Sequence, residues 1–282
     1  MLSIVKKFPN VLANDHINFF INQGEIHALL GENGAGKTTL MNILFGLYQA
    51  DEGEIRIRGK SVSIKSPKDA IQLGIGMVHQ HFKLVDTNTV AENIALSLQS
   101  EGPKASFLNI IKFFQNPLPA VEKRIIGLSK KYGLSIDPLT KIWQLSLGEQ
   151  QRVEILKILI KGVEILILDE PTSVLTPIET ADLFRTLEAM RNEGRSIIFI
   201  THKLDEVMKI SDRVTVLQNG RVIATLETSK TNKRELARLM IGREVLFRLH
   251  KEKVDIGPPI LKVQGLEALN DKILPALKGI SF

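Results

Sequence analysis

The feature that most constrains this chain is a glycine-rich loop between a short apolar strand and an apolar helix. The strand is expected at residues 26–30 and the helix at 40–44, and the loop reads Gly31-Glu32-Asn33-Gly34-Ala35-Gly36-Lys37-Thr38. It fits the pattern G-x-x-x-x-G-K-[ST] in the strand–loop–helix context that the pattern requires. Its backbone N–H groups can turn inward around phosphate oxygens, beside a partially positive helix N-terminus. We therefore predict a phosphate-binding loop rather than a glycine-rich turn without function.

Two carboxylates follow a second apolar strand. Residues 165–168 are Ile-Leu-Ile-Leu, and Asp169 and Glu170 come next. If this strand end lies beside the phosphate loop, Asp169 can reach a Mg²⁺ ion held by the Thr38 hydroxyl, and Glu170 can polarise an attacking water. Lys37 is expected to bridge the phosphates. Buried strands also end in acidic residues without function, so this prediction depends on the neighbouring loop.

The remaining periodicity predicts an α/β fold. From residue 145 onward, helical spacing alternates with short apolar runs, which is typical of a parallel sheet flanked by helices. Asn219-Gly220 suits a type I′ turn and predicts a hairpin, and residues 54–59 alternate apolar and charged side chains as a strand does. The expected segments are strands at 165–168, 196–200, 214–217 and 222–226, and helices at 89–98, around 153–160, at 177–193 and at 231–241.

Residues 99–144 are interrupted by prolines. Short helices broken by loops are therefore predicted there. Three phenylalanines between the prolines predict either a small local core or a surface that docks a partner. The residues concerned are Pro103, Pro117, Pro119 and Pro138, and Phe107, Phe113 and Phe114.

Composition excludes several classes of protein. The 282 residues include no cysteine, so disulfides, thiolate metal sites and cysteine nucleophiles are absent. No apolar stretch approaches the roughly 20 residues of a membrane-spanning helix, and no secretory signal follows Met1, which predicts a cytoplasmic location. The net charge is +6, and residues 221–253 hold nine basic and four acidic side chains. That segment is either a solvated helix face or a surface for nucleic acid or anionic lipid.

A third motif resembles that of a known family. Leu145-Ser146-Leu147-Gly148-Glu149-Gln150-Gln151-Arg152 resembles the signature of ABC transporter ATPases, and it precedes Asp169-Glu170 by the distance that family shows. The resemblance covers residues 4 to about 245. It implies a P-loop NTPase of the ABC ATPase type, with a mixed, mainly parallel core sheet, an antiparallel β subdomain and a helical subdomain at about 81–160.

The resemblance also implies roles for single residues. Phe8 resembles the aromatic that stacks on adenine, Gln80 the Q-loop glutamine, and His202 the switch histidine that contacts the γ-phosphate and steadies Glu170. A core aromatic, a surface glutamine and an interior histidine are the respective alternatives. Glu170, His202 and Gln80 would then be catalytic, and Thr38, Gln80 and Asp169 would hold Mg²⁺. ATP would contact Phe8, Gly31, Glu32, Asn33, Gly34, Ala35, Gly36, Lys37, Thr38, Thr39, Gln80, Asp169 and, from another cassette, Ser146 and the Gly148 backbone.

Three positions depart from the family pattern. Leu147 replaces the usual second glycine of the signature, Glu149 replaces the usual glutamine, and Thr176 replaces the aspartate that follows the Glu170 segment. These departures put the packing of the signature against an opposing nucleotide in question.

A short repeat predicts how the chain is organised. Residues 11–19 and 275–282 share the skeleton Ala-x-x-x-Ile-x-Phe, and Gly257-Pro258-Pro259 looks like a linker. We expect an ATP-binding cassette at 1–245, a linker at 246–259 and the start of a truncated second cassette at 260–282. The longer motifs resemble the first cassette of tandem importer ATPases for nucleosides and simple sugars, which carry two cassettes on one chain.

The resemblance therefore implies an ATP-hydrolysing importer subunit at the cytoplasmic face of the cell membrane. Its implied partners are membrane permease subunits, a solute-binding protein and a second ATPase cassette in a homodimer or another chain, with no specific nucleic acid. Two alternatives stay open. One is a soluble ABC ATPase acting on ribosomes or nucleic acid, and the other is a truncated cassette that binds nucleotide without hydrolysing it.

Overall fold

The computed structural model describes residues 1–80, 82–99, 118–242, 257–269 and 275–282. Its internal contacts divide the chain into two units, Met1–Val245 and Leu246–Phe282. The phosphate loop and every other predicted site residue lie in the first unit.

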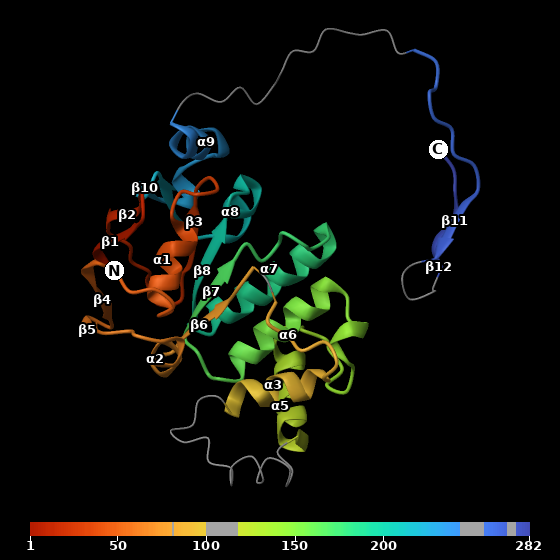
Figure 1. The fold of residues 1–282 in the computed structure, drawn as a ribbon, viewed down its shortest axis with the longest axis horizontal. Helices are drawn as coiled ribbons and strands as arrows, with labels where there is room; N and C mark the ends of the chain where they lie inside the picture. The colour runs from red at the N-terminus through yellow and green to blue at the C-terminus, as the bar shows by residue number, and fades with distance from the viewer. Residues whose placement is uncertain (81, 100–117, 243–256, 270–274) are drawn as a thin grey trace. The chain divides into compact units, whose positions relative to one another are not determined.

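A six-stranded sheet forms the core of the first unit (Figure 1). Five neighbouring strands pair in parallel and the sixth closes the edge as an antiparallel hairpin. Their order is β10 (Arg221–Glu227), β9 (Arg213–Gln218), β3 (Ile26–Leu30), β8 (Ser196–Thr201), β7 (Ile165–Asp169) and β6 (Ile75–Val78). This mixed, mainly parallel sheet confirms the predicted fold class. Its parallel pairing places the carboxyl ends of β3, β7 and β8 at one edge of the sheet.

Both faces of this sheet are buried, and side chains of one strand alternate between them. On β8, Ile197 and Phe199 join one apolar cluster, whereas Ile198 and Ile200 join another. This explains why the central strands read as continuous apolar runs. Besides α3 and α5, which are described below, the helices of the first unit include α1 (Lys37–Leu44), α2 (Pro67–Gln72), α6 (Leu147–Leu159), α7 (Pro177–Asn192), α8 (Leu204–Ile210) and α9 (Lys233–Ile241).

A second, antiparallel sheet covers part of this core. Its strand order is β2 (Val11–Ile17), β1 (Leu2–Phe8), β4 (Glu52–Ile57) and β5 (Lys60–Val62). Ile4 and Ile17 are register partners, and both are fully buried in the core cluster that contains α1. This sheet is the antiparallel β subdomain that the sequence predicts.

A group of helices forms the expected helical subdomain. Helix α3 (Val90–Gln99) begins with a capping box in which Glu92 accepts from the Thr89 N–H. The expectation of short broken helices is wrong for α5 (Leu118–Tyr132), which runs unbroken for 15 residues. Pro119 lies in its first turn, where a missing N–H leaves no hydrogen bond unmade. Pro103 and the cluster of Phe107, Phe113 and Phe114 lie outside the described residues.

The second unit contains a hairpin of β11 (Leu266–Leu269) and β12 (Pro275–Ile280). It reproduces the pairing of β1 with β2. Met1 exchanges two backbone hydrogen bonds with Phe19, and Val263 does the same with Phe282. Leu266 pairs with Ile280, as Ile4 pairs with Ile17. Leu266 and Ile280 are exposed, at 43% and 42%, whereas their counterparts are fully buried.

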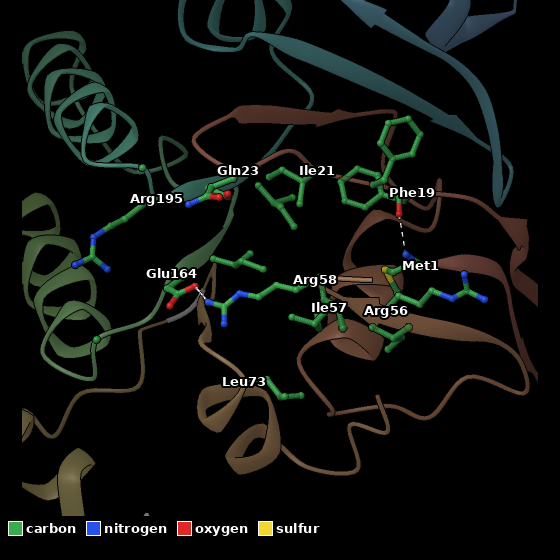
Figure 2. Close-up of a pocket in the computed structure, with 18 of the residues that line it drawn as sticks. Met1, Phe19, Ile21, Gln23, Arg56, Ile57, Arg58, Leu73, Glu164 and Arg195 are labelled. Carbon is green, nitrogen blue, oxygen red and sulfur yellow. Dashed lines mark hydrogen bonds and ion pairs between the residues drawn. The ribbon is translucent and has the colours of Figure 1, made fainter. Parts of the chain in front are cut away.

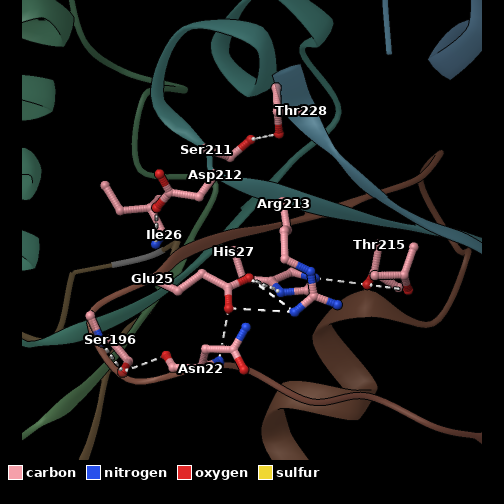
Figure 3. A network of polar contacts seen from close by, with 12 residues as sticks. Asn22, Glu25, Ile26, His27, Ser196, Ser211, Asp212, Arg213, Thr215 and Thr228 are labelled. Carbon is pink, nitrogen blue, oxygen red and sulfur yellow. Dashed lines mark hydrogen bonds and ion pairs between the residues drawn. The ribbon is translucent and has the colours of Figure 1, made fainter. Parts of the chain in front are cut away.

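The amino ends of the parallel strands hold a buried polar network (Figure 3). His27 is fully buried, with Nδ1 2.8 Å from Glu25 Oε1 and Nε2 2.7 Å from Thr215 Oγ1. Glu25 also accepts from the Asn22 N–H and from Arg213. These contacts tie β3 to β9, far along the strands from the phosphate loop.

An adjoining cavity of about 690 Å³ lies between the two sheets (Figure 2). Apolar side chains including Phe19 and Ile57 line it, and Arg58 pairs with Glu164 at its edge. None of the predicted nucleotide contacts lines this cavity. Within the described ranges, no helix has both the length and the apolar character needed to cross a membrane.

Candidate functional site

The phosphate loop connects β3 to α1 through a turn that requires glycine. Gly36 has φ 98°, and a Cβ there would lie 2.3 Å from the Ala13 carbonyl oxygen on β2. Asn14 also donates to the Gly36 carbonyl at 3.1 Å. The loop is therefore fixed against the antiparallel sheet, which holds its backbone N–H groups in place for an anion.

Lys37 lies in the first turn of α1 with its side chain folded over the loop. Its Nζ donates to the carbonyls of Gly31 and Glu32 at 2.8 and 2.9 Å. Burial lowers the pKa of Lys37, while Glu170 and Asp169 act in the opposite direction. A buried ammonium held only by carbonyls gains from an anionic partner, and a bound phosphate would supply one.

Asp169 ends β7 beside Thr38, as predicted. The Thr38 hydroxyl lies 3.5 Å from Asp169 Oδ1. Burial raises the pKa of Asp169, and the negative charge of Glu170 raises it further. A carboxylate and a hydroxyl that converge from two elements are the oxygen ligands that Mg²⁺ prefers.

Glu170 and His202 meet just beyond β7 and β8. His202 Nδ1 lies 2.9 Å from Glu170 Oε1, and the His202 side chain is 43% exposed. Glu170 has φ 46°, a left-handed conformation that few residues other than glycine adopt. Its N–H donates to the Ile200 carbonyl, so the strained backbone is held by the neighbouring strand. Strain of this kind is concentrated at functional sites.

A cavity of about 720 Å³ gathers many of the predicted residues. Both Glu170 and Phe8 line it, together with residues of the phosphate loop. The predicted residues that line it are Phe8, Asn33, Gly34, Gly36, Lys37, Thr38, Thr39, Gln80 and Glu170. Phe8 is 37% exposed and contacts Tyr48 edge to face at 5.5 Å between ring centroids. The alternative of Phe8 as a core aromatic is therefore wrong.

Ser146 and Gly148 do not line this cavity. Ser146 caps the N-terminus of α6 in a capping box with Glu149, and its hydroxyl lies 2.9 Å from Glu149 Oε2. A Cβ at Gly148 would lie 2.2 Å from Glu179 Oε1 of α7, so a larger residue there would displace the Glu179 carboxylate. The signature residues Ser146 and Gly148 therefore lie outside the cavity that contains this chain's own phosphate loop.

Thr176, the departure after the Glu170 segment, has a structural use. It caps α7, its hydroxyl accepting from the Glu179 N–H and donating to the Glu179 carboxylate. The sequence Thr-Pro-Ile-Glu at 176–179 fits a capping box, with proline in the first helical turn.

Sequence reasoning missed several residues around the cavity. Asn219 and Gly220 line it, and the Gly220 N–H donates to the Ala35 carbonyl at 3.1 Å. The Asn-Gly dipeptide predicted the turn between β9 and β10, but it did not predict that this turn contacts the phosphate loop. Tyr48 and Asn14 were also missed, and no local motif marks either of them.

The sheet order, the phosphate loop and the paired carboxylates define a P-loop nucleotide-binding cassette. The family model described as ABC transporter matches residues 14–173. The chain belongs to this family.

Relatives and solved structures agree with this assignment. The chain is 50% identical over its full length to the guanosine import ATP-binding protein NupO of Bacillus subtilis, covering 53% of that protein. It is 48% identical to the glucose import ATP-binding protein TsgD13 of Haloferax volcanii, over 100% of this chain and 54% of that one. The chain therefore spans about half the length of these curated relatives.

The fold also matches that of MJ1267, an ATP-binding cassette of an ABC transporter, in its ADP conformation. The TM-score is 0.71 at 28% identity, covering 86% of this chain and 97% of the other.

Proposed function

We propose that this chain is an ATP-binding and ATP-hydrolysing cassette of an importer for nucleosides or simple sugars. The observation that carries the proposal is the convergence of Lys37, Thr38, Asp169 and Glu170 at one edge of the parallel sheet. The names of the two relatives support the solute class, because one is an import protein for guanosine and the other for glucose.

The proposed chemistry depends on positioning and on electrostatic stabilisation. The loop N–H groups and Lys37 bind the phosphates, and Phe8 with Tyr48 gives the nucleotide base an exposed aromatic edge. Glu170 takes a proton from the attacking water. His202 steadies Glu170 through Nδ1, which lies 2.9 Å from Glu170 Oε1, and its other ring nitrogen is proposed to contact the γ-phosphate.

Thr38, Asp169 and Gln80 are the residues that would hold Mg²⁺. The hydroxyl of Thr38 and the carboxylate of Asp169 converge, and Gln80 lines the same cavity as Thr38. These oxygen donors fit the ion, which when bound neutralises phosphate charge. Ionisation of Asp169, which burial disfavours, would be promoted by a cation at this place.

Ser146 and the Gly148 backbone are proposed to complete a site on a second cassette. Neither residue lines this chain's own cavity, and both lie at a helix N-terminus, which is suited to bind a γ-phosphate. The hairpin of the second unit supports a tandem arrangement, with a cassette at 1–245, a linker at 246–259 and a second cassette that starts at 260. Its exposed Leu266 and Ile280 correspond to residues that the core buries in the first unit.

The proposed partners are membrane permease subunits, a solute-binding protein and a second ATPase cassette. The chain would dock as a peripheral protein on the cytoplasmic face of the cell membrane. The nucleic-acid alternative rests on the basic residues 221–253, part of which lies outside the described residues, and we do not favour it. The hydrolysis-incompetent alternative is decided by the experiment below.

Steady-state ATP hydrolysis and mass by light scattering, measured on the purified chain at increasing concentration, test the proposal. We expect turnover per chain to rise with concentration together with an ATP-dependent dimer. Glu170→Gln serves as the control, and we expect it to bind ATP normally while turnover falls by about 10²-fold or more. A monomer that binds ATP without turning it over would support the incompetent cassette instead.

A further inference from the structure

A buried carboxylate contacts both of the segments that carry Glu170 and His202. Glu206, on α8, is 8% exposed. Its Oε1 accepts from the Thr172 hydroxyl at 2.6 Å, and its Oε2 accepts from the Thr201 hydroxyl at 3.0 Å. One carboxylate thus joins the segment after β7 to the end of β8.

The two threonines are close in sequence to the pair in the proposed site. Thr172 follows Glu170 by two residues, and Thr201 immediately precedes His202. Both threonines are buried, at 3% and 2% exposure. A shift of either segment would therefore break a buried hydrogen bond to Glu206, which is costly because the freed polar group has no water partner.

Lys203 balances the charge of this cluster. Its Nζ lies 3.1 Å from Glu206 Oε1 and donates to the Thr172 carbonyl at 3.0 Å. The Lys203 N–H also donates to the Thr201 hydroxyl at 3.0 Å. Each oxygen of Glu206 therefore has a defined partner, and a fully satisfied buried network holds its members rigidly.

We propose that Glu206 is a positioning residue that fixes the separation between the segments carrying Glu170 and His202. Glu206 does not line the cavity of the proposed nucleotide site. It acts through Thr172 and Thr201, and so sets the contact between His202 Nδ1 and Glu170 Oε1. This inference rests on the proposed function, in which that pair promotes attack by water.

Glu206→Gln removes the charge while keeping the size of the side chain. We expect kcat for ATP hydrolysis to fall about 10-fold with KM changed less than about 3-fold, because a misplaced catalytic pair affects the chemical step rather than binding. Thr172→Val should lower kcat similarly. The double variant should fall by less than the product of the two single effects, because both changes remove the same contact.

Backbone hydrogen–deuterium exchange of the nucleotide-free chain gives a readout that needs no turnover. In Glu206→Gln, exchange should rise at 170–173 and at 200–203 together. Glu25→Gln is the matched control, because Glu25 is a buried, hydrogen-bonded carboxylate at the opposite end of the strands. That variant should leave both segments and kcat unchanged.

Wild-type kcat in Glu206→Gln, or increased exchange confined to α8, would overturn the proposed role of Glu206. Nucleotide binding by the wild-type chain, measured on the same samples, tests the proposed function separately. A chain that fails to bind ATP but shows the paired rise in exchange would refute the ATPase proposal and leave the positioning role standing.

Discussion

Among the residues that the structure describes, two histidine–glutamate pairs have nearly equal contact distances but opposite surroundings. His27 Nδ1 lies 2.8 Å from Glu25, and His202 Nδ1 lies 2.9 Å from Glu170. The His27 side chain is fully buried, whereas that of His202 is 43% exposed. The geometry of the pair alone therefore does not distinguish a structural role from a catalytic one.

The difference lies in the second ring nitrogen. Nε2 of His27 is 2.7 Å from the Thr215 hydroxyl (Figure 3). That hydroxyl is also hydrogen-bonded to the Thr225 hydroxyl, at 2.8 Å. Among the described residues, the structure gives no hydrogen bond to Nε2 of His202. In the first pair both ring nitrogens thus have a protein partner, whereas in the second pair, within the described part of the chain, only Nδ1 of the histidine has one.

The largest effect should come from His202→Ala. We expect ATP turnover to fall about 10²-fold, as when one stabilising donor is removed from an active site, with the unfolding free energy changed less than about 0.5 kcal/mol. Steady-state kinetics and denaturant unfolding of the same preparation measure the two quantities. If His202→Ala lost as much unfolding free energy as His27→Ala, the two histidines would not differ in their structural roles.

His27→Ala should show the converse pattern. We expect the unfolding free energy to fall by about 2–3 kcal/mol, because Glu25 and Thr215 lose buried partners. Turnover of the folded fraction should change less than about 2-fold, since the network lies at the other end of the strands. Urea unfolding and hydrolysis assays at a temperature where the variant is folded test this. A selective loss of turnover at full stability would contradict it.

The smallest expected effect is on the pH dependence of stability, through the buried carboxylate Glu25. Burial opposes ionisation of Glu25, but hydrogen bonds from His27 and the Asn22 N–H outweigh it, and the pKa lies below the ordinary value of 4.5. A depressed folded-state pKa stabilises the fold above the unfolded pKa, and this stabilisation is lost as pH falls through the folded value. The stability advantage of wild type over Glu25→Gln, about 1 kcal/mol at neutral pH, should therefore shrink below pH 4.5. Unfolding curves of both proteins across this pH range measure the difference in stability. A wild-type advantage that grew as the pH fell would contradict the lowered pKa of Glu25.

Local sequence patterns predicted the elements that carry the site. The strand at Ile26–Leu30 and the β9–β10 hairpin follow from an apolar run and an Asn-Gly turn. The helix after the phosphate loop was expected at 40–44, and it begins earlier, at Lys37. Asp169 was expected near Thr38 only on the condition that the end of its strand lies beside the phosphate loop, and the parallel pairing of β3, β8 and β7 meets that condition.

Contacts between distant segments could not be predicted in this way. The edge-to-face contact of Phe8 with Tyr48 and the bridge from Glu206 to Thr172 depend on how elements pack, which periodicity does not encode. The unbroken α5 was missed because the position of a proline within a helix, not its presence, decides whether the helix ends.

The tip of the β9–β10 hairpin gives the molecule a built-in reporter. The Gly220 N–H donates to Ala35 of the phosphate loop, and its carbonyl accepts from the Asp15 N–H at 2.8 Å on the antiparallel sheet. Gly220 has no side chain that could contribute to catalysis, and its φ of 75° suits glycine. Its amide resonance in a nuclear magnetic resonance spectrum would therefore register rearrangement of the loop on nucleotide binding, without a label or substitution at any catalytic position.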